Sequence, residues 1–337
     1  MQRRAYVPVT VRGDALGVLV VHLPADDCWT SAGTDADGAF LRESVVRQLN
    51  AVAHTLGYIV IANQRHTDVF QTAMRSAPFS LAMEIQRRLL PSAFVCEGGA
   101  FTLAGWFEPS ASAGGDTFDY TASTDRLTVS LTDAVGHDVT ASLLATLTVN
   151  ALRNARRSGA TLLEQVEAAN EALLTHAQAG QFVTGIVLEV DLTTADVTEP
   201  DDHEDPSSPV ALRIVNAGHP GGLLLRGGEV VDVAAAGNAA LGIRAGAFEQ
   251  QELWLLPGDR LLLMTDGMYE RTAAAFDIRG FLGDTADRHP RNVAQDLSRA
   301  FLEATGGIIK DDAALVLLEW HGGSTRRTTL SGADVGR

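Results

Sequence analysis

Residues 114–119 read Gly-Gly-Asp-Thr-Phe-Asp, and this stretch opens the first of four segments in which an aspartate borders an apolar, strand-like run. Asp133 follows the run 127–132, Asp266 follows 260–265, and Asp311 precedes 313–318. A carboxylate beside a hydrophobic strand is costly unless a positive charge meets it. Aspartate is also a common turn residue, but four in comparable settings predict one shared cation site.

The donor atoms of this site indicate which metal it takes. Carboxylates without thiolates form a hard, oxygen-only site that suits Mg²⁺ or Mn²⁺. Two such ions ~3.5–4 Å apart can activate a water near neutral pH, as phosphate ester hydrolysis requires. Gly114, Gly115 and Gly267 let the backbone approach a metal or phosphate closely, although each also fits an ordinary turn.

Composition limits the other function classes. A length of 337 residues suggests two domains at ~150 residues each, and 46% hydrophobic residues suffice for ordinary cores. The net charge of -16 argues against a nucleic-acid surface and against anionic membranes. Cys28 and Cys96 lack the spacing of a zinc or disulfide site, and no signal peptide or apolar run of ~20 residues is evident. A cytoplasmic protein without membrane or nucleic-acid partners is predicted.

The N-terminal part predicts two strands, at 5–10 and 16–23, and a long helix over 39–73. Its apolar residues recur at spacings of three and four, as in a coiled coil. This stripe predicts either a homodimer through the 39–73 helix or an intrachain core helix. A short helix over 80–90 follows, between Pro78 and Pro91.

Beyond residue 95 the pattern predicts antiparallel strands with grouped helices, which is typical of an α+β layered domain. Strands are expected at 100–108, 114–121, 126–132, 183–191, 210–217, 221–226, 247–255, 259–265 and 313–320, and helices at 139–157, 162–179, 278–284 and 291–304.

Together these motifs resemble a known family. The segments 84–91 (Glu-Ile-Gln-Arg-Arg-Leu-Leu-Pro), 114–119, 132–138 (Thr-Asp-Ala-Val-Gly-His-Asp), 216–220 (Asn-Ala-Gly-His-Pro), 265–270 (Thr-Asp-Gly-Met-Tyr-Glu) and 311–312 (Asp-Asp) occur in the order of the SpoIIE/RsbU branch of PPM (protein phosphatase 2C-like) Ser/Thr phosphatases. The resemblance covers roughly residues 80–321. It implies an αββα four-layer sandwich, in which two antiparallel sheets flanked by helices hold two Mn²⁺ or Mg²⁺ ions at one edge.

The resemblance also assigns residues. It implies that Asp116, Asp133 and Asp266 are catalytic and bind metal, with Asp116 as the bridging ligand, the main-chain carbonyl of Ala134 as a further ligand, and Asp311 completing the set. Asp312 is the alternative to Asp311. Asp119, Gly267 and His137 are secondary candidates, and a structural role is favoured for His137 and His219. Asp138 departs from the glycine that many members carry, which predicts altered loop geometry.

The implied function is a metal-dependent phosphoserine/phosphothreonine protein phosphatase that uses a two-metal-activated water. Its expected partner is a phosphorylated protein substrate, and the resemblance implies a STAS-type anti-sigma-factor antagonist. The expected organisation is a partial GAF-like sensory segment with a linker helix at 1–75, a connector helix at 76–95, the phosphatase domain at 96–322 and a flexible tail at 323–337.

The sequence also has two alternative interpretations. Residues 114–118 resemble the GGDEF signature of diguanylate cyclases, but Thr117 replaces its acidic residue and the other three aspartates stay unexplained. A catalytically inactive phosphatase-like scaffold in the same type of pathway is the second alternative. Loss of a ligand aspartate would favour it, and all four are present.

Overall fold

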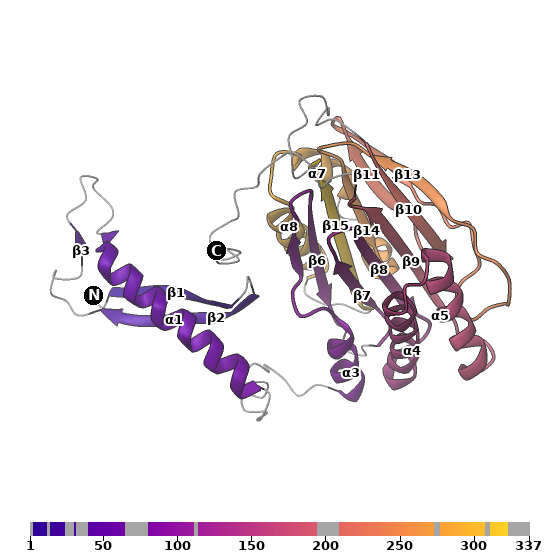
Figure 1. Ribbon diagram of the computed structural model, residues 1–337, viewed down its shortest axis with the longest axis horizontal. Coiled ribbons are helices and arrows are strands. Elements are labelled where there is room, and N and C mark those ends of the chain that lie inside the picture. The colour runs from indigo at the N-terminus through magenta and orange to yellow at the C-terminus, as the bar shows by residue number, and fades with distance from the viewer. Residues whose placement is uncertain are drawn as a thin grey trace. The chain divides into compact units, whose positions relative to one another are not determined.

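A computed structural model describes residues 3–11, 14–23, 30–31, 40–64, 80–110, 114–193, 209–272, 277–306 and 311–322. The described residues fall into two compact units, one within residues 1–78 and the other within 79–327 (Figure 1). The predicted tail at 323–337 lies outside the described residues.

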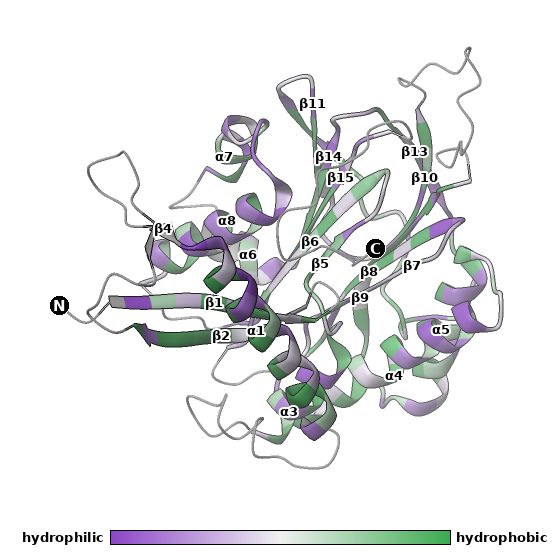
Figure 2. Ribbon diagram, turned by 60° about the vertical axis from the view of Figure 1, so that its left-hand side comes forward, coloured by the Kyte–Doolittle hydropathy of each residue, from purple (hydrophilic) through white to green (hydrophobic). Residues whose placement is uncertain are grey.

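The smaller unit is built on an antiparallel hairpin of β1 (Arg3–Val11) and β2 (Asp14–Leu23). Helix α1 (Glu43–Gln64) packs against it, with Ala53 buried among Val7 and Val9. Gly57 lies so close to β1 that an added Cβ would stand 2.5 Å from Val11 Cγ2. Figure 2 shows β2 hydrophobic along most of its length, yet its Val18 and Val20 side chains are exposed, because α1 packs mainly on β1.

The strand pair is present where it was expected, but the long helix differs. It begins at Glu43 and not at residue 39, because Phe40–Leu41 (β4) pairs as a short strand with Thr30–Ser31 (β3). The predicted stretch 65–73 lies outside the described residues. The GAF-like assignment stays a prediction.

Helix α1 also bears on the membrane prediction. Among the described residues, Glu43–Asn63 is long and apolar enough to cross a membrane by length and composition alone, with a mean hydropathy of 1.2. The expectation that no run approaches a membrane span therefore does not hold for this helix. One such helix is weak evidence, since helices of soluble proteins pass the same test.

The larger unit contains two antiparallel sheets. The first has the strand order β13-β10-β9-β8-β7, and the second has the order β12-β11-β14-β15-β6-β5. The first sheet consists of β7 (Thr117–Ala122), β8 (Arg126–Ala134), β9 (Val183–Asp191), β10 (Val210–Ala217) and β13 (Gln251–Leu255). The second consists of β5 (Val95–Glu97), β6 (Phe101–Glu108), β11 (Gly222–Arg226), β12 (Glu229–Val233), β14 (Arg260–Met264) and β15 (Ala313–Trp320).

Helices cover the outer face of each sheet. Helices α4 (Asp138–Arg157) and α5 (Leu162–His176) lie on the first sheet with α3 (Leu81–Leu89) beside α4, and α6 (Asp266–Thr272), α7 (Ile278–Asp284) and α8 (Pro290–Ala304) lie on the second (Figure 1). Local signals fix some helix starts: Thr161 and Glu164 form a capping box before α5, and Pro290 occupies the first turn of α8. The predicted αββα sandwich is confirmed.

Strand periodicity explains how the layers hold together. In β8, Leu127, Val129 and Leu131 alternate into the core between the sheets. The same period of two directs Asp133 to that inner face at the strand end. Separate cores lie under α4 and α5, around Val149 and Val187, and under α8, around Phe301.

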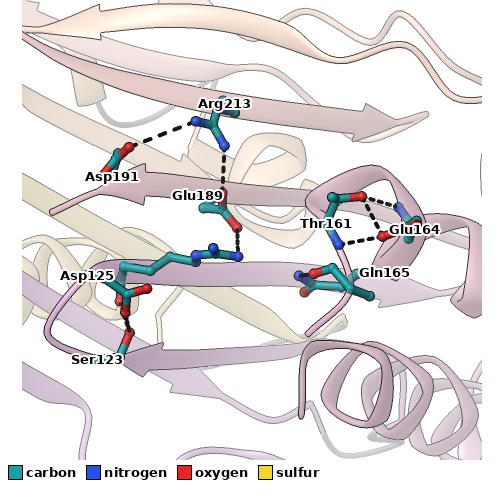
Figure 3. Close-up of polar contacts among 10 residues, drawn as sticks. Ser123, Asp125, Thr161, Glu164, Gln165, Glu189, Asp191 and Arg213 are labelled. Atoms are coloured by element: carbon teal, nitrogen blue, oxygen red, sulfur yellow. Dashed lines mark hydrogen bonds and ion pairs between the residues drawn. The ribbon is translucent and has the colours of Figure 1, made fainter. Parts of the chain in front are cut away.

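The outer face of the first sheet also carries charge. Glu189 on β9 is 4% exposed and pairs with Arg126 at 3.1 Å and Arg213 at 3.0 Å. Figure 3 shows Arg213 reaching both Glu189 and Asp191 across neighbouring strands. A buried carboxylate held by two guanidinium groups costs less than an unpaired one, so this cluster ties β8, β9 and β10 together.

Candidate metal centre

The two sheets bring all four aspartate segments to one edge of the sandwich. Asp116 immediately precedes β7 and Asp133 is the penultimate residue of β8, and these strands pair through Thr117 and Thr132. In the second sheet, Asp266 follows β14 and Asp311 precedes β15, which pairs with β14 through Met264 and Leu315. Antiparallel neighbours thus place the end of one strand beside the start of the next.

Electrostatics show that the carboxylates of this edge gather closely. Burial, followed by the charges of Asp133, Asp312 and Asp266, raises the pKa of Asp116 well above its usual value. Burial and then the charge of Asp266 raise the pKa of Asp133 to about 7. Asp116 is 2% exposed, and its Oδ2 has no hydrogen-bond partner among the described residues. A buried carboxylate oxygen in such surroundings calls for a cation.

Asp311 and Asp312 differ sharply. The carboxylate of Asp312 is buried and accepts hydrogen bonds from Ser110 N (2.8 Å), Gly114 N (3.0 Å) and Gln86 Nε2 (2.6 Å). Asp311 is exposed, and its Oδ1 accepts from the backbone N–H of Asp312 at 2.9 Å. Asp312 therefore fastens the chain before β7 to the start of β15, while Asp311 stands at the surface of the edge.

Sequence reasoning missed Gln86 as a residue of this site. It lies on α3, is 1% exposed, and also donates from Nε2 to the main-chain carbonyl of Asp116 at 2.8 Å. One signal was available in the sequence, because Gln86 shares a helix face with the buried Ala82 and Leu89. An amide on an apolar face requires a polar partner across the interface.

All three glycine positions that the sequence singled out are tight, and an added Cβ at Gly114 would stand 2.9 Å from the carbonyl oxygen of Asp138. An added Cβ at Gly115 would collide with the carbonyl oxygen of Ala134, and one at Gly267 would collide with the carbonyl oxygen of Asp312. Both obstacles are backbone atoms, so neither can swing aside. Close backbone approach explains both glycines here.

The loop after β8 carries His137 and Asp138. The exposed His137 ring lies 2.8 Å from the Asp138 carboxylate. Asp138 has a φ of 66°, in the left-handed region that glycine adopts most readily. This explains why glycine suits the position, and aspartate is among the residues that tolerate it.

The structure separates Asp119 from the aspartate edge. Its carboxylate accepts hydrogen bonds from Arg153 (2.8 and 3.1 Å) and Arg156 (3.2 Å) on α4. Arg153 also donates to the main-chain carbonyl of Leu89 at 2.6 Å, at the end of α3. Asp119 therefore links the first sheet to two helices.

His219 lies buried behind the edge. Its Nδ1 is 3.0 Å from Thr184 Oγ1, which in turn lies 3.5 Å from the main-chain carbonyl of Asp133. Burial lowers the pKa of His219 to about 4, with a backbone hydrogen bond at Met264 acting in the opposite direction. A neutral His219 thus contacts both sheets, and the structural role favoured from the sequence stays a prediction.

The aspartates are close without forming a closed cage. Within the described ranges, no group of three or more His, Cys, Asp and Glu side chains has the geometry of a preformed metal site. Their donor chemistry nevertheless fits hard divalent ions, because every candidate ligand is an oxygen and one buried oxygen lacks a partner.

Comparison with known proteins identifies the family. The family model described as stage II sporulation protein E (SpoIIE) matches residues 123–199 and 205–321. The chain belongs to the SpoIIE family. The matched span includes Asp133, Asp266 and Asp311, and it covers both sheets except for β5, β6 and β7. Asp116 lies before the matched residues.

Solved structures agree with this family. The RsbU and RsbW domains of a Mycobacterium tuberculosis protein match with 25% identity and a TM-score of 0.55, covering 67% of this chain and 61% of that one. The PP2C phosphatase domain of Bacillus subtilis SpoIIE, with a regulatory fragment, matches at 17% identity and 0.54, covering 67% and 64%. The SiaA PP2C domain of Pseudomonas aeruginosa matches at 20% and 0.55, covering 71% and 94%. This chain thus spans less than two thirds of the Mycobacterium tuberculosis and Bacillus subtilis structures. The similarities to the Bacillus subtilis and Pseudomonas aeruginosa domains concern the fold alone.

Proposed function

We propose that this protein is a metal-dependent phosphoserine/phosphothreonine protein phosphatase. The observation that carries the proposal is the pair of neighbouring carboxylates of the buried Asp116 and the half-buried Asp133, whose pKa values are raised at one edge of a SpoIIE-family fold. Such a pair is unstable as two anions without cations. Membership of a family that includes PP2C phosphatase domains supports phosphoester hydrolysis over other metal chemistry.

The ligand set follows from the geometry and the resemblance together. Asp116, Asp133, Asp266 and Asp311 would supply carboxylate oxygens and Ala134 a main-chain carbonyl, a set suited to two Mn²⁺ or Mg²⁺ ions. Asp311 is preferred to Asp312, because the oxygens of Asp312 already accept three hydrogen bonds. When bound, the ions would activate a water and neutralise the phosphoryl oxygens.

The chain's own residues would orient this site. Gln86 and Asp312 hold the main chain that carries Asp116, and Thr184 supports the main chain that carries Asp133. Because these supports are buried hydrogen bonds, they can keep the carboxylates in place despite mutual repulsion. Gly115 and Gly267 let the backbone at Ala134 and at Asp312 approach closely, which keeps the chains that carry the carboxylates together.

The substrate is proposed to be a phosphorylated protein in bacterial partner switching, such as a STAS-type anti-sigma-factor antagonist in the cytoplasm. Support comes from the SpoIIE family and from the solved RsbU and RsbW domains, which show 25% identity. A homodimer through α1 is a further proposal. Its support is the exposed apolar side chains of Val46, Val52, Tyr58 and Ile59.

The direct test is phosphate release from a phosphoserine peptide with Mn²⁺ or Mg²⁺. Turnover that a chelator abolishes is expected, together with a loss of at least a hundredfold in Asp133→Asn and Asp266→Asn. Asp232→Asn, an exposed aspartate on β12, is the matched control and should retain activity. No metal-dependent release from a folded preparation would favour the inactive scaffold, and activity in both site variants would contradict the ligand assignment.

A further inference from the structure

The loop between β12 and β13 forms a cavity that the metal centre does not use. This cavity has a volume of about 340 Å³ and is lined by residues 237–239 and 244–249. Arg244 and Glu249 contribute its charged side chains, and both are exposed. Among the residues that the structure describes, no carboxylate forms an ion pair with Arg244.

This loop is firmly built. Asn238 donates to the main-chain carbonyls of Asn216 (3.1 Å) and Glu249 (2.9 Å) and accepts from Glu249 N at 2.7 Å. Asn170 of α5 bonds Gly242 N (2.8 Å) and the carbonyl of Arg244 (3.2 Å). These hydrogen bonds hold the main chain on both sides of the cavity. The backbone of Arg244 is therefore held in place by α5 and the first sheet.

The loop also lies at the sheet edge that carries Asp133. Leu241 pairs with Val183 of β9, and Val183 pairs with Ala134 of β8. Two strand spacings separate Leu241 from Ala134, which amounts to about 10 Å. An extended peptide covers that distance in about three residues. The distance is counted from the backbone of Leu241, which is buried and lies between the two lining segments of the cavity, three residues before Arg244.

We propose that this cavity binds a carboxylate side chain of the phosphorylated substrate, about three residues from the phosphoserine. The inference rests on the proposed phosphatase function. A guanidinium matches a carboxylate with two parallel hydrogen bonds, and Arg244 is available for such a pair. Ile243, the residue before Arg244, is 51% exposed and offers apolar contact to the same partner. The substrate recognised here is therefore an acidic phosphopeptide segment.

The test compares phosphoserine peptides that differ at one position. The peptides carry Glu, Gln or Lys three residues before or after the phosphoserine, and kcat/KM is measured for each with Mn²⁺. Wild type should prefer Glu over Lys on one side by about threefold, since exposed charge pairs contribute modestly. Arg244→Gln should flatten this ranking, and Arg244→Glu should invert it.

A second variant of the same cavity should change the preference for the Glu peptide in the direction opposite to the Arg244 variants. Glu249→Gln removes a competing carboxylate, so it should increase the preference for the Glu peptide by about twofold. A purely structural role of the loop would move both variants the same way. Arg299→Glu on α8, 68% exposed, is the matched control for a change of charge and should keep the wild-type ranking.

Binding separates this proposal from the proposed function. Fluorescence anisotropy of the same labelled peptides reads recognition without turnover. If the protein hydrolysed neither the phosphorylated peptides nor p-nitrophenyl phosphate, the proposed phosphatase function would be contradicted. The order of peptide affinities from anisotropy would still show whether the cavity binds a carboxylate. An unchanged ranking in Arg244→Gln and Arg244→Glu, by binding or kinetics, would overturn the proposal.

Discussion

Asp311 and Asp312 are neighbours in sequence, yet their carboxylates face different environments. Asp312 is 2% exposed and accepts hydrogen bonds from a side-chain amide and two backbone N–H groups, while Asp311 is exposed. A carboxylate saturated with donors in the fold has little capacity left for a metal. The sequence alone could not rank the pair, because the donors come from residues about 200 positions away.

This contrast predicts that Asp312→Ala mainly loses stability and that Asp311→Asn mainly loses metal binding. Asp312→Ala should lower the free energy of unfolding by about 3 kcal/mol, because it leaves three buried donors unpaired. Asp311→Asn should change it by less than about 0.5 kcal/mol, as for an exposed site. Urea denaturation with a chelator measures both. Calorimetric Mn²⁺ titration should instead show the larger defect in Asp311→Asn, and the reverse pattern would exchange the two assignments.

His219 predicts a pH-dependent stability. Its pKa is lowered to about 4, below the ordinary value of 6.5, so its contribution is fully present above pH 6.5 and is lost as pH falls through 4. Between pH 7.5 and 5 this amounts to about 2 kcal/mol. Urea denaturation of wild type and His219→Asn should therefore give a stability difference that narrows at pH 5. A constant difference at both pH values would contradict a neutral, buried His219.

At the scale of elements, α6 begins at Asp266 directly after β14, and Gly267 makes this junction possible. A side chain there would meet the backbone of Asp312, and backbone cannot rotate away. Gly267→Ala should therefore destabilise the fold by about 1–3 kcal/mol through overpacking. The effect is measurable as a lower midpoint of thermal unfolding.

A second helical glycine serves as the control for this prediction. Gly283 in α7 has open space around its Cα, so Gly283→Ala should gain about 0.5–1 kcal/mol from helix propensity. Opposite signs in the two variants would attribute the loss to the contact at Asp312. Equal changes would mean that propensity alone governs both positions.

Sequence patterns predicted the strongly periodic elements well. The bounds of β9, β10, α7 and β15 agree with expectation, because long apolar runs and clear cap residues mark them. The elements β5, β12 and α6 were missed. They are short, and β12 is an edge strand without a buried face, so their pairing depends on contacts distant in sequence. Strands at 114–121 and 247–255 were predicted to start before the observed Thr117 and Gln251.

The site was predictable to a similar depth. An aspartate at the end of an apolar run can be recognised in the sequence. The two sheets then bring these aspartates to one edge. Gln86 and Thr184 were not recognised, because each supports the site through a bond to main chain elsewhere in the fold. The ion pairs of Asp119 could not be predicted for the same reason, since its arginine partners lie 34 and 37 positions away.

For the whole molecule, the acidic edge couples stability to metal. The sandwich buries three apolar cores, one between the sheets and one under the helices on each side. It also brings together carboxylates that repel one another. Ions that bind the folded edge and not the unfolded chain stabilise the fold by mass action. Under the proposed function, a bound metal would act on folding as well as on chemistry.

This coupling should depend on pH in a defined direction. Burial raises the pKa of Asp133 to about 7, so in metal-free protein its contribution to stability is present below the ordinary value of 3.8 and is lost as pH rises through 7. Metal binds the deprotonated form, so the stabilisation by Mg²⁺ should grow from pH 5.5 to pH 8. At a Mg²⁺ concentration of 100 Kd it reaches about 2.7 kcal/mol. Scanning calorimetry of the full chain with Mg²⁺ or with chelator measures this increment at each pH. Asp133→Asn should lose most of the increment and its pH dependence while Asp232→Asn keeps both, and an increment that falls as pH rises would contradict metal binding by these carboxylates.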